Sequence, residues 1–333
     1  MPSPAPVPLP ERVLGDLTVP AVGYGAMELG GAYAVPASPE DAHAALVAAV
    51  AAGCTFVDTS DAYGPNERQI GAFLESGAGR DQILISTKFG LRPFPDAPTH
   101  RIPIAYGAGE FRINADPAYV RRYLERSLDR LGTDRVDVYS PHFPDPEVPI
   151  RDTVAAMARL QEEGLVGHLG LSNPTLADLE QAQSVARIAA VQVEWSMWHP
   201  IDPALLAHCE ASGVGVVAYS PVGRGFLAGA LTEVDAATDF RATIDRFAPA
   251  NLTANNDRYA PVRAVAGELG LTPAQLALAW LLHRSPAVVP IPGSRTPAHI
   301  AENASAAAVT LDADALARID AALARFVPAG QVS

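Results

Sequence analysis

Short apolar runs that alternate with helical segments constrain the fold of this chain most strongly. The helical segments have apolar residues at three- and four-residue spacing, and the short runs have the continuous apolar character of strands buried on both faces. Repeated βα units of this kind predict an α/β fold, a closed (β/α)8 TIM barrel. We expect strands at about 22–25, 55–58, 83–88, 136–140, 168–172, 190–193, 215–219 and 287–291, and helices at about 40–52, 117–131, 150–163, 174–186, 203–212, 273–283 and 312–326.

A doubly wound open sheet is the alternative architecture. Its dinucleotide-binding form needs a third glycine in the first turn, which the segment 23–28, Gly-Tyr-Gly-Ala-Met-Glu, lacks. The length of 333 residues suits one large barrel. We expect a proline-rich, disordered arm at 1–10, a single barrel domain at 11–330 that opens with a β-hairpin near 13–19, and a long loop after the seventh strand at about 220–255 that acts as a lid.

Composition excludes several classes of partner. The net charge of −13 disfavours nucleic acid and anionic membranes. No apolar run is long enough to span a bilayer, and the first residues lack the pattern of a signal peptide. Cys54 and Cys209 lie far apart in apolar stretches, which favours reduced thiols. We therefore expect a cytoplasmic protein that binds a small molecule and no metal, as a monomer or a homo-oligomer.

The chain contains one lysine, Lys88, at the end of a predicted strand. Arginine cannot replace a compact ammonium in a tight cavity, so this lysine is a candidate for chemistry. In a barrel, residues at the carboxyl ends of strands share one pocket. Asp58 and His142 end two other predicted strands, and Tyr63 follows Asp58 by five positions.

These four residues together predict proton donation to a carbonyl group. An ammonium about 4 Å from a phenol stabilises the phenolate by about 4 kcal/mol at an effective dielectric constant near 20, so Lys88 would make Tyr63 a usable acid. Asp58 would hold Lys88, and a neutral His142 would hydrogen-bond the carbonyl oxygen. Singly, each residue has an ordinary structural explanation, such as a turn or a cap.

Five segments, 58–64, 86–90, 137–142, 170–173 and 218–221, resemble the aldo-keto reductase superfamily in order and spacing. The resemblance covers nearly the whole chain. It implies a barrel that binds NADPH without a Rossmann fold and reduces aldehydes and ketones, with NADH the less favoured cofactor. The family's catalytic tetrad would fall on Asp58, Tyr63, Lys88 and His142.

The resemblance also implies a cofactor site. Ser172, Asn173 and Gln192 would hold the carboxamide, and Tyr219 would stack on the nicotinamide. Gln192 lies in a buried apolar strand and needs polar partners, whereas Asn173 before Pro174 could instead cap a helix. The loop after Tyr219 would contribute Ser220, Pro221, Gly223 and Arg224.

The segment 291–303 resembles the family's adenosine-phosphate segment. Ser294 and Arg295 would bind the 2′-phosphate, where a helix N-terminus also favours an anion. Two positions depart from a common form of the pattern, because Gly293 stands where many members have lysine and His299 where many have arginine. Glu302 and Asn303 would face the adenine.

Aromatic residues near the strand ends suggest a pocket for aromatic or apolar carbonyls. Phe143 follows His142 where arginine is frequent in the family, which would alter the pocket wall. The expected wall residues are Tyr24, Met27, Phe89, Trp195 and Trp198.

Two other functions compete with the reductase. One is a cofactor-binding regulatory subunit resembling potassium-channel beta subunits. The other is a Schiff-base lyase that uses Lys88 as nucleophile, which requires a lowered lysine pKa, whereas Asp58 is expected to raise it.

Overall fold

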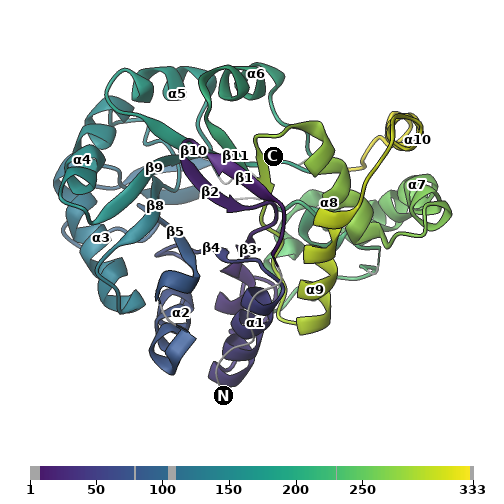
Figure 1. The fold of residues 1–333 in the computed structure, drawn as a ribbon, viewed down its shortest axis with the longest axis horizontal. Helices are drawn as coiled ribbons and strands as arrows, with labels where there is room; N and C mark the ends of the chain where they lie inside the picture. Colours follow the sequence, from purple (N-terminus) through teal and green to yellow (C-terminus); the bar gives the residue numbers. More distant parts are fainter. Residues whose placement is uncertain (1–7, 79, 104–109, 230, 331–333) are drawn as a thin grey trace.

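A parallel sheet of eight strands forms the centre of the computed structural model, which describes residues 8–78, 80–103, 110–229 and 231–330 (Figure 1). The two ends of the sheet meet, because the N–H groups of Gly23 and Gly25 donate to Pro290 (3.0 Å) and Pro292 (3.2 Å). The predicted (β/α)8 barrel is confirmed. In sheet order the strands are β3 (Tyr24–Gly25), β4 (Phe56–Asp58), β5 (Leu84–Phe89), β8 (Val136–Pro141), β9 (Val166–Ser172), β10 (Ile188–Glu194), β11 (Gly215–Tyr219) and β12 (Val288–Pro290).

Glycines permit the close approach of β3 to its neighbours. A Cβ atom on Gly25 would lie 2.5 Å from the carbonyl oxygen of Ile291, and one on Gly23 would lie 2.8 Å from that of Phe56. The Gly-x-Gly pattern at 23–25 therefore has a packing reason. It closes the barrel.

Seven helices match the predicted ones to within a few residues. The largest differences are at the C-terminal ends of α5 and α10, each of which ends three residues before the expected position. Helix α5 also begins two residues after the expected Pro174, because Thr175 forms a capping box with Asp178. Asn173 does not cap this helix. The seven are α1 (Pro39–Ala51), α3 (Pro117–Leu131), α4 (Ile150–Glu162), α5 (Leu176–Gln183), α6 (Pro203–Ser212), α8 (Pro273–Arg284) and α10 (Ala313–Leu323).

Several elements were not expected from the sequence. The predicted loop at 220–255 ends early, because α7 (Pro249–Glu268) begins inside it. A second hairpin, β6 (His100–Pro103) with β7 (Glu110–Ile113), follows β5. The others are α2 (Asn66–Phe73), the π-helical turn η2 (Leu74–Ala78) and the 3-10 turns η1 (Ala26–Gly30), η3 (Arg80–Gln82), η4 (Gly223–Gly225), η5 (Phe240–Thr243), η6 (Asp245–Phe247) and η7 (Ala306–Ala308). The helix whose N-terminus was expected near Arg295 is α9 (Pro297–Ser305).

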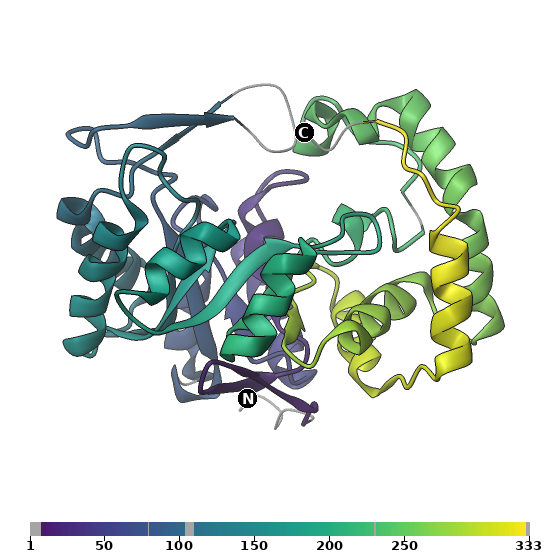
Figure 2. The same cartoon turned by 90° about the horizontal axis from the view of Figure 1, so that it is seen from above.

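The expected N-terminal hairpin, β1 (Glu11–Leu14) with β2 (Leu17–Pro20), closes one end of the barrel. Leu14 and Val19 pack in one buried cluster with Phe56, Val217 and other inward-facing strand residues. The two hairpins lie at opposite ends of the molecule, so the end that carries β6 and β7 is left for a site (Figure 2). Residues 1–7 of the expected arm lie outside the described residues.

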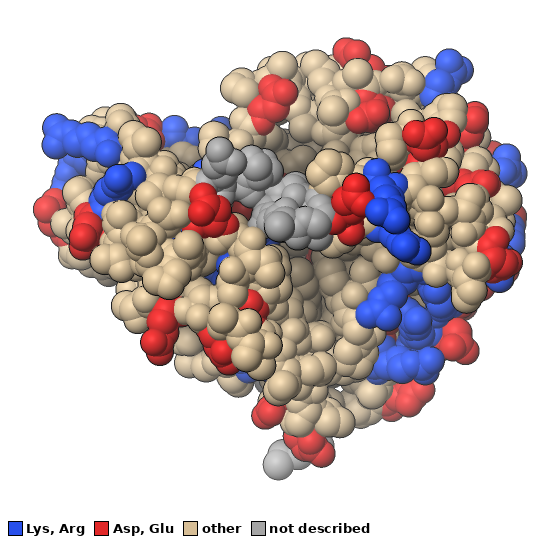
Figure 3. All heavy atoms as spheres, turned by 180° about the vertical axis from the view of Figure 1, so that it is seen from behind, with Lys and Arg blue, Asp and Glu red and all other residues tan. Residues whose placement is uncertain are grey.

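On the face opposite the N-terminal hairpin, Lys and Arg side chains gather toward the two sides, and uncharged residues predominate between them (Figure 3). Within the described ranges, no single helix is both long and apolar enough to cross a membrane. Only α7 and α8 taken together meet those criteria, and these two helices are bent by 86°.

Candidate active site

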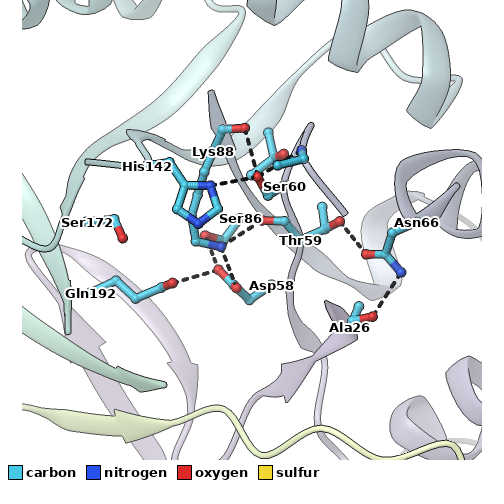
Figure 4. A network of polar contacts seen from close by, with 12 residues as sticks. Ala26, Asp58, Thr59, Ser60, Asn66, Ser86, Lys88, His142, Ser172 and Gln192 are labelled. Atoms are coloured by element: carbon cyan, nitrogen blue, oxygen red, sulfur yellow. Dashed lines mark hydrogen bonds and ion pairs between the residues drawn. The ribbon is translucent and has the colours of Figure 1, made fainter. Parts of the chain in front are cut away.

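Three residues of the predicted tetrad, Asp58, Lys88 and His142, lie close together at one end of the barrel (Figure 4). Lys88 Nζ lies 2.6 Å from Asp58 Oδ1 and donates to the Thr59 carbonyl oxygen at 2.7 Å. The same ammonium lies 5.2 Å from the centroid of the Tyr63 ring. The Tyr63 ring meets the His142 ring edge-on, with 5.6 Å between their centroids. The topology thus gathers residues from the ends of β4, β5 and β8, as parallel strands in a barrel do.

The Asp58 carboxylate is buried and accepts three hydrogen bonds. Lys88 donates to Oδ1, while Ser86 Oγ (2.9 Å) and Gln192 Nε2 (2.7 Å) donate to Oδ2. The amide nitrogen of Gln192, which was predicted to hold a carboxamide, faces Asp58. This strand residue therefore braces the tetrad from across the barrel.

Burial lowers the pKa of Lys88, and the neighbouring Asp58 carboxylate opposes the shift without cancelling it. Asp58 raises the pKa of this lysine, as expected, but removal of the ammonium from water is the larger effect and the net shift is downward. The Lys88 side chain is only 1% exposed.

His142 is held on two sides. Its Nδ1 lies 2.9 Å from Ser60 Oγ, and its carbonyl oxygen accepts from Asn173 Nδ2 at 3.1 Å. Burial, followed by the charge of Lys88, keeps the pKa of His142 well below its usual range. The imidazole is therefore neutral near pH 7.

A chain of hydrogen bonds joins three predicted cofactor residues at the ends of β9 and β11. Asn173 Nδ2 donates to Ser172 Oγ at 3.1 Å, and the Tyr219 hydroxyl donates to Asn173 Oδ1 at 2.9 Å. Asn173 also reaches His142, so this group and the tetrad form one continuous network.

Backbone strain is concentrated at the same rim. In the described part of the chain, the non-glycine residues with positive φ are Asn173 (55°), Ser220 (50°) and Arg224 (55°). Each such conformation costs about 1–3 kcal/mol and tends to persist at functional sites. All three positions were predicted from the sequence to contact the cofactor.

Charged side chains stabilise the loop after β11 through an ion pair and a hydrogen bond. Arg224 is 7% exposed and pairs with Glu194 at 2.9 Å. Arg241 Nη1 donates to the Arg224 carbonyl oxygen at 2.7 Å. Pro221 and Gly223 are buried in this loop.

The segment after β12 packs against the start of the barrel. A Cβ atom on Gly293 would lie 2.5 Å from the Gly25 carbonyl oxygen, which explains why no lysine stands there. Arg295 donates through Nε (3.0 Å) and Nη2 (2.6 Å) to the carbonyl oxygen of Glu28. Ser294 is buried, and its Oγ accepts from the N–H of Thr296.

The remaining predicted residues of this segment lie on α9, which begins directly after Thr296. His299 is exposed and Asn303 is buried. Glu302 accepts from the Thr272 hydroxyl at 2.5 Å, so its carboxylate already has a partner.

Two of the five predicted pocket-wall residues pack elsewhere. Phe89 is fully buried and stacks on Tyr139, with 4.8 Å between centroids, and on Tyr123 of α3, so its ring faces the helix layer. Tyr24 is buried and donates to the Ser294 carbonyl oxygen at 2.8 Å.

The other three predicted wall residues differ in exposure. Trp195 is buried, and Met27 lies half-buried in η1. Trp198 packs against Phe226, with 4.0 Å between centroids, and lines a small pocket with Glu194 and Arg224.

Two aromatic residues, Phe143 and Phe111, form a pair next to His142, and only Phe143 was expected from the sequence. The Phe143 ring is nearly parallel to the His142 ring, with 5.4 Å between centroids, and Phe111 of β7 lies 5.7 Å from Phe143. The place of Phe143 after His142 in the sequence pointed to it. Phe111 carried no such signal, because its hairpin was not predicted. Ser60 was also missed, although it lies inside the segment that carries Asp58 and Tyr63.

Known proteins resemble this chain over nearly its full length. The model of the Aldo/keto reductase family matches residues 21–324. Aldo-keto reductase str7 from Strobilurus tenacellus is 36% identical over 324 residues, which covers 94% of this chain and 91% of that protein.

Solved structures agree with this fold. An aldo/keto reductase from Klebsiella pneumoniae in complex with NADP and acetate has a TM-score of 0.71 and 26% identity, covering 98% of both chains. Glycerol dehydrogenase AKR11B4 from Gluconobacter oxydans has a TM-score of 0.79 at 24% identity and covers 96% of both chains. A thermostable aldo-keto reductase, Tm1743, in complex with epalrestat has a TM-score of 0.71 and 27% identity, covering 94% of this chain and 100% of that one. The chain belongs to the aldo/keto reductase family and is an NAD(P)H-dependent oxidoreductase.

Proposed function

We propose that this enzyme reduces an aldehyde or ketone to an alcohol with NADPH, and that Tyr63 supplies the proton to the carbonyl oxygen. The observation that carries this proposal is the position of the Lys88 ammonium, 2.6 Å from Asp58 Oδ1 and 5.2 Å from the centroid of the Tyr63 ring. For a phenolate charge placed at the ring centroid, a cation at that distance contributes about 3 kcal/mol of stabilisation at an effective dielectric constant near 20. Asp58 reduces this effect while it holds the ammonium in place.

His142 complements Tyr63 in this proposal. A neutral imidazole can donate a hydrogen bond to the carbonyl oxygen without competing for the proton that Tyr63 transfers. The carbonyl oxygen would therefore lie between the phenol and the imidazole, where two donors stabilise the negative charge that develops on it.

The residues at the rim fit a nicotinamide cofactor. The Ser172, Asn173 and Tyr219 network offers amide and hydroxyl groups for a carboxamide beside an aromatic ring for stacking. The strained backbone at Asn173, Ser220 and Arg224 supports a ligand at this rim. NADPH, when bound, supplies the hydride, and these side chains hold and orient the nicotinamide.

Preference for NADPH over NADH rests on Arg295. Its guanidinium donates two hydrogen bonds, from Nε and Nη2, to the Glu28 carbonyl oxygen. These bonds fix the side chain just before the start of α9. The remaining donors of the fork would bind the 2′-phosphate.

The aromatic pair Phe111 and Phe143 favours carbonyl substrates with a flat apolar group. It lies directly beside His142 and reaches out to the β6–β7 hairpin. A neutral substrate also suits the predominantly uncharged face at this end of the barrel (Figure 3).

The structure does not favour the lyase alternative. A Schiff base requires Lys88 Nζ to reach the substrate carbonyl carbon, but the Lys88 side chain is 1% exposed and Nζ is hydrogen-bonded to Asp58 and Thr59. A lowered pKa alone does not make the amine accessible.

A direct test mixes the purified protein with NADPH and a panel of aromatic and aliphatic aldehydes while nicotinamide absorbance is followed. We expect oxidation of NADPH with at least one aromatic aldehyde and weaker activity with NADH. Tight NADPH binding without turnover of any aldehyde or ketone would favour the regulatory subunit instead.

A further inference from the structure

Ser60 connects the Tyr63 loop to His142. Its side chain is 1% exposed and lies two residues after Asp58. Ser60 Oγ lies 2.9 Å from His142 Nδ1 and accepts a hydrogen bond from the N–H of Ala62 at 3.2 Å (Figure 4). The Ser60 carbonyl oxygen also accepts from the N–H of Tyr63 at 3.2 Å.

The direction of the bond between Ser60 and His142 follows from the available acceptors. The hydroxyl proton of a buried serine needs an acceptor, because an unsatisfied donor costs about 1–3 kcal/mol. The carbonyl oxygen of Lys88 and the carboxylate of Asp61 both lie at 3.5 Å, whereas His142 Nδ1 lies at 2.9 Å. The Ser60 hydroxyl therefore donates to its nearest acceptor, which is His142 Nδ1.

An imidazole that accepts at Nδ1 carries its proton on Nε2 when it is neutral. No described residue hydrogen-bonds His142 Nε2, so this N–H is available to a ligand. The buried position of His142 beside the Lys88 ammonium disfavours a second proton on the ring.

We propose that Ser60 is a positioning residue that fixes His142 in the tautomer protonated at Nε2, so that this nitrogen donates to the carbonyl oxygen of the substrate. The inference deepens the proposed carbonyl reduction and depends on it for the identity of the acceptor. Without Ser60, the tautomer protonated at Nδ1 would become accessible, and Nε2 would then present a lone pair to the carbonyl oxygen. That arrangement repels the oxygen and cannot stabilise its developing charge.

The tautomer can be read in the wild-type protein by nitrogen NMR of 15N-histidine-labelled enzyme with NADP+ bound. The His142 resonances are assigned by their loss in His142→Gln. We expect a neutral ring protonated at Nε2. A ring protonated at Nδ1 overturns the proposal, whatever the turnover of the enzyme.

Kinetics of Ser60→Ala give a second test. We expect kcat to fall about tenfold, as for the loss of one well-placed hydrogen bond, while the Kd for NADPH stays within about twofold. In this variant the His142 resonances should show a mixture of tautomers. Unchanged kcat together with unchanged His142 resonances would overturn the proposal.

Ser127→Ala is the matched control, because Ser127 is a fully buried serine on α3 whose Oγ has no hydrogen-bond partner. It should leave both kcat and the His142 resonances unchanged. Absence of carbonyl reduction by the wild type would contradict the proposed function, while the NMR result would still decide the role of Ser60.

Discussion

Replacement of Asp58 by asparagine should destabilise the fold strongly, because it leaves a buried ammonium without its counter-charge. The ion-paired side chains of Lys88 and Asp58 are only 1% and 4% exposed, and their closest atoms lie 2.6 Å apart. Asparagine keeps the shape of the side chain but replaces one acceptor with an N–H donor. All three partners of Asp58, which are Lys88, Ser86 and Gln192, are donors, so at least one pair becomes donor against donor.

The size of the effect can be bounded. Two unit charges at 2.6 Å attract by about 6 kcal/mol at an effective dielectric constant near 20. Lys88 can escape part of this loss by releasing its proton, since burial already lowers its pKa. Removal of one partner of a buried pair costs about 3–5 kcal/mol, and we expect a loss of unfolding free energy in that range.

Urea denaturation followed by tryptophan fluorescence measures this loss for Asp58→Asn, Lys88→Met and the double variant. The loss of unfolding free energy in the double variant should be smaller than the sum of the two single losses by about 2 kcal/mol or more. Asp16→Asn is the control, because Asp16 pairs with Arg187 on the surface and should cost less than about 1 kcal/mol. A loss below about 1 kcal/mol in Asp58→Asn, or strict additivity, would refute the reasoning.

Three further predictions concern the cofactor, the substrate and pH. Arg295→Ala should weaken NADPH binding about tenfold or more, as for loss of a charged hydrogen bond, and leave NADH nearly unchanged in fluorescence titrations; equal weakening would reject the 2′-phosphate role. Phe111→Ala should lower kcat/KM for benzaldehyde about threefold to tenfold relative to propanal, because an aromatic pair contributes about 0.5–1.5 kcal/mol; a parallel decrease for both aldehydes would contradict the aromatic wall. Burial raises the pKa of Asp61 to about 7 despite its pairing with Arg126. The folded state therefore retains a proton that the unfolded state has lost, and unfolding free energy should decrease between about pH 4 and about pH 7. Asp61→Asn should flatten this decrease in urea titrations, and an unchanged slope would assign it to other groups.

Periodicity predicted the architecture because each strand is buried on both faces and each helix has one apolar face. It failed where local chemistry interrupts the pattern. Helix α7 carries Pro261 in its interior and polar residues such as Asn255 and Asn256, so its sequence reads as a loop. Tertiary contacts stabilise it instead, since Leu252, Tyr259 and Val262 are buried. The β6–β7 hairpin lies in a proline-rich stretch, so it carried no clear strand signal.

The polar strand ends predicted that Asp58, Lys88 and His142 lie together, because the barrel gathers the ends of its strands. Side-chain direction was harder to predict. Gln192 was correctly expected to need partners, but only the three-dimensional structure shows that its nitrogen faces Asp58. Phe89 follows Lys88 directly and therefore points to the opposite face of the strand, away from the pocket. The net direction of the Lys88 pKa shift could not be predicted from the sequence either, because the effect of burial on Lys88 is larger than the effect of the Asp58 charge.

The central claim is that Tyr63 donates the proton, and a comparison of turnover with cofactor binding in Tyr63→Phe tests it most directly. This variant should bind NADPH with a Kd within about twofold of wild type and lose at least about a hundredfold in kcat, because general acid catalysis contributes at least that factor. Tyr119→Phe, which removes a hydroxyl bonded to the Asp96 carbonyl oxygen on the surface, should retain full activity. Wild-type kcat in Tyr63→Phe would contradict the account.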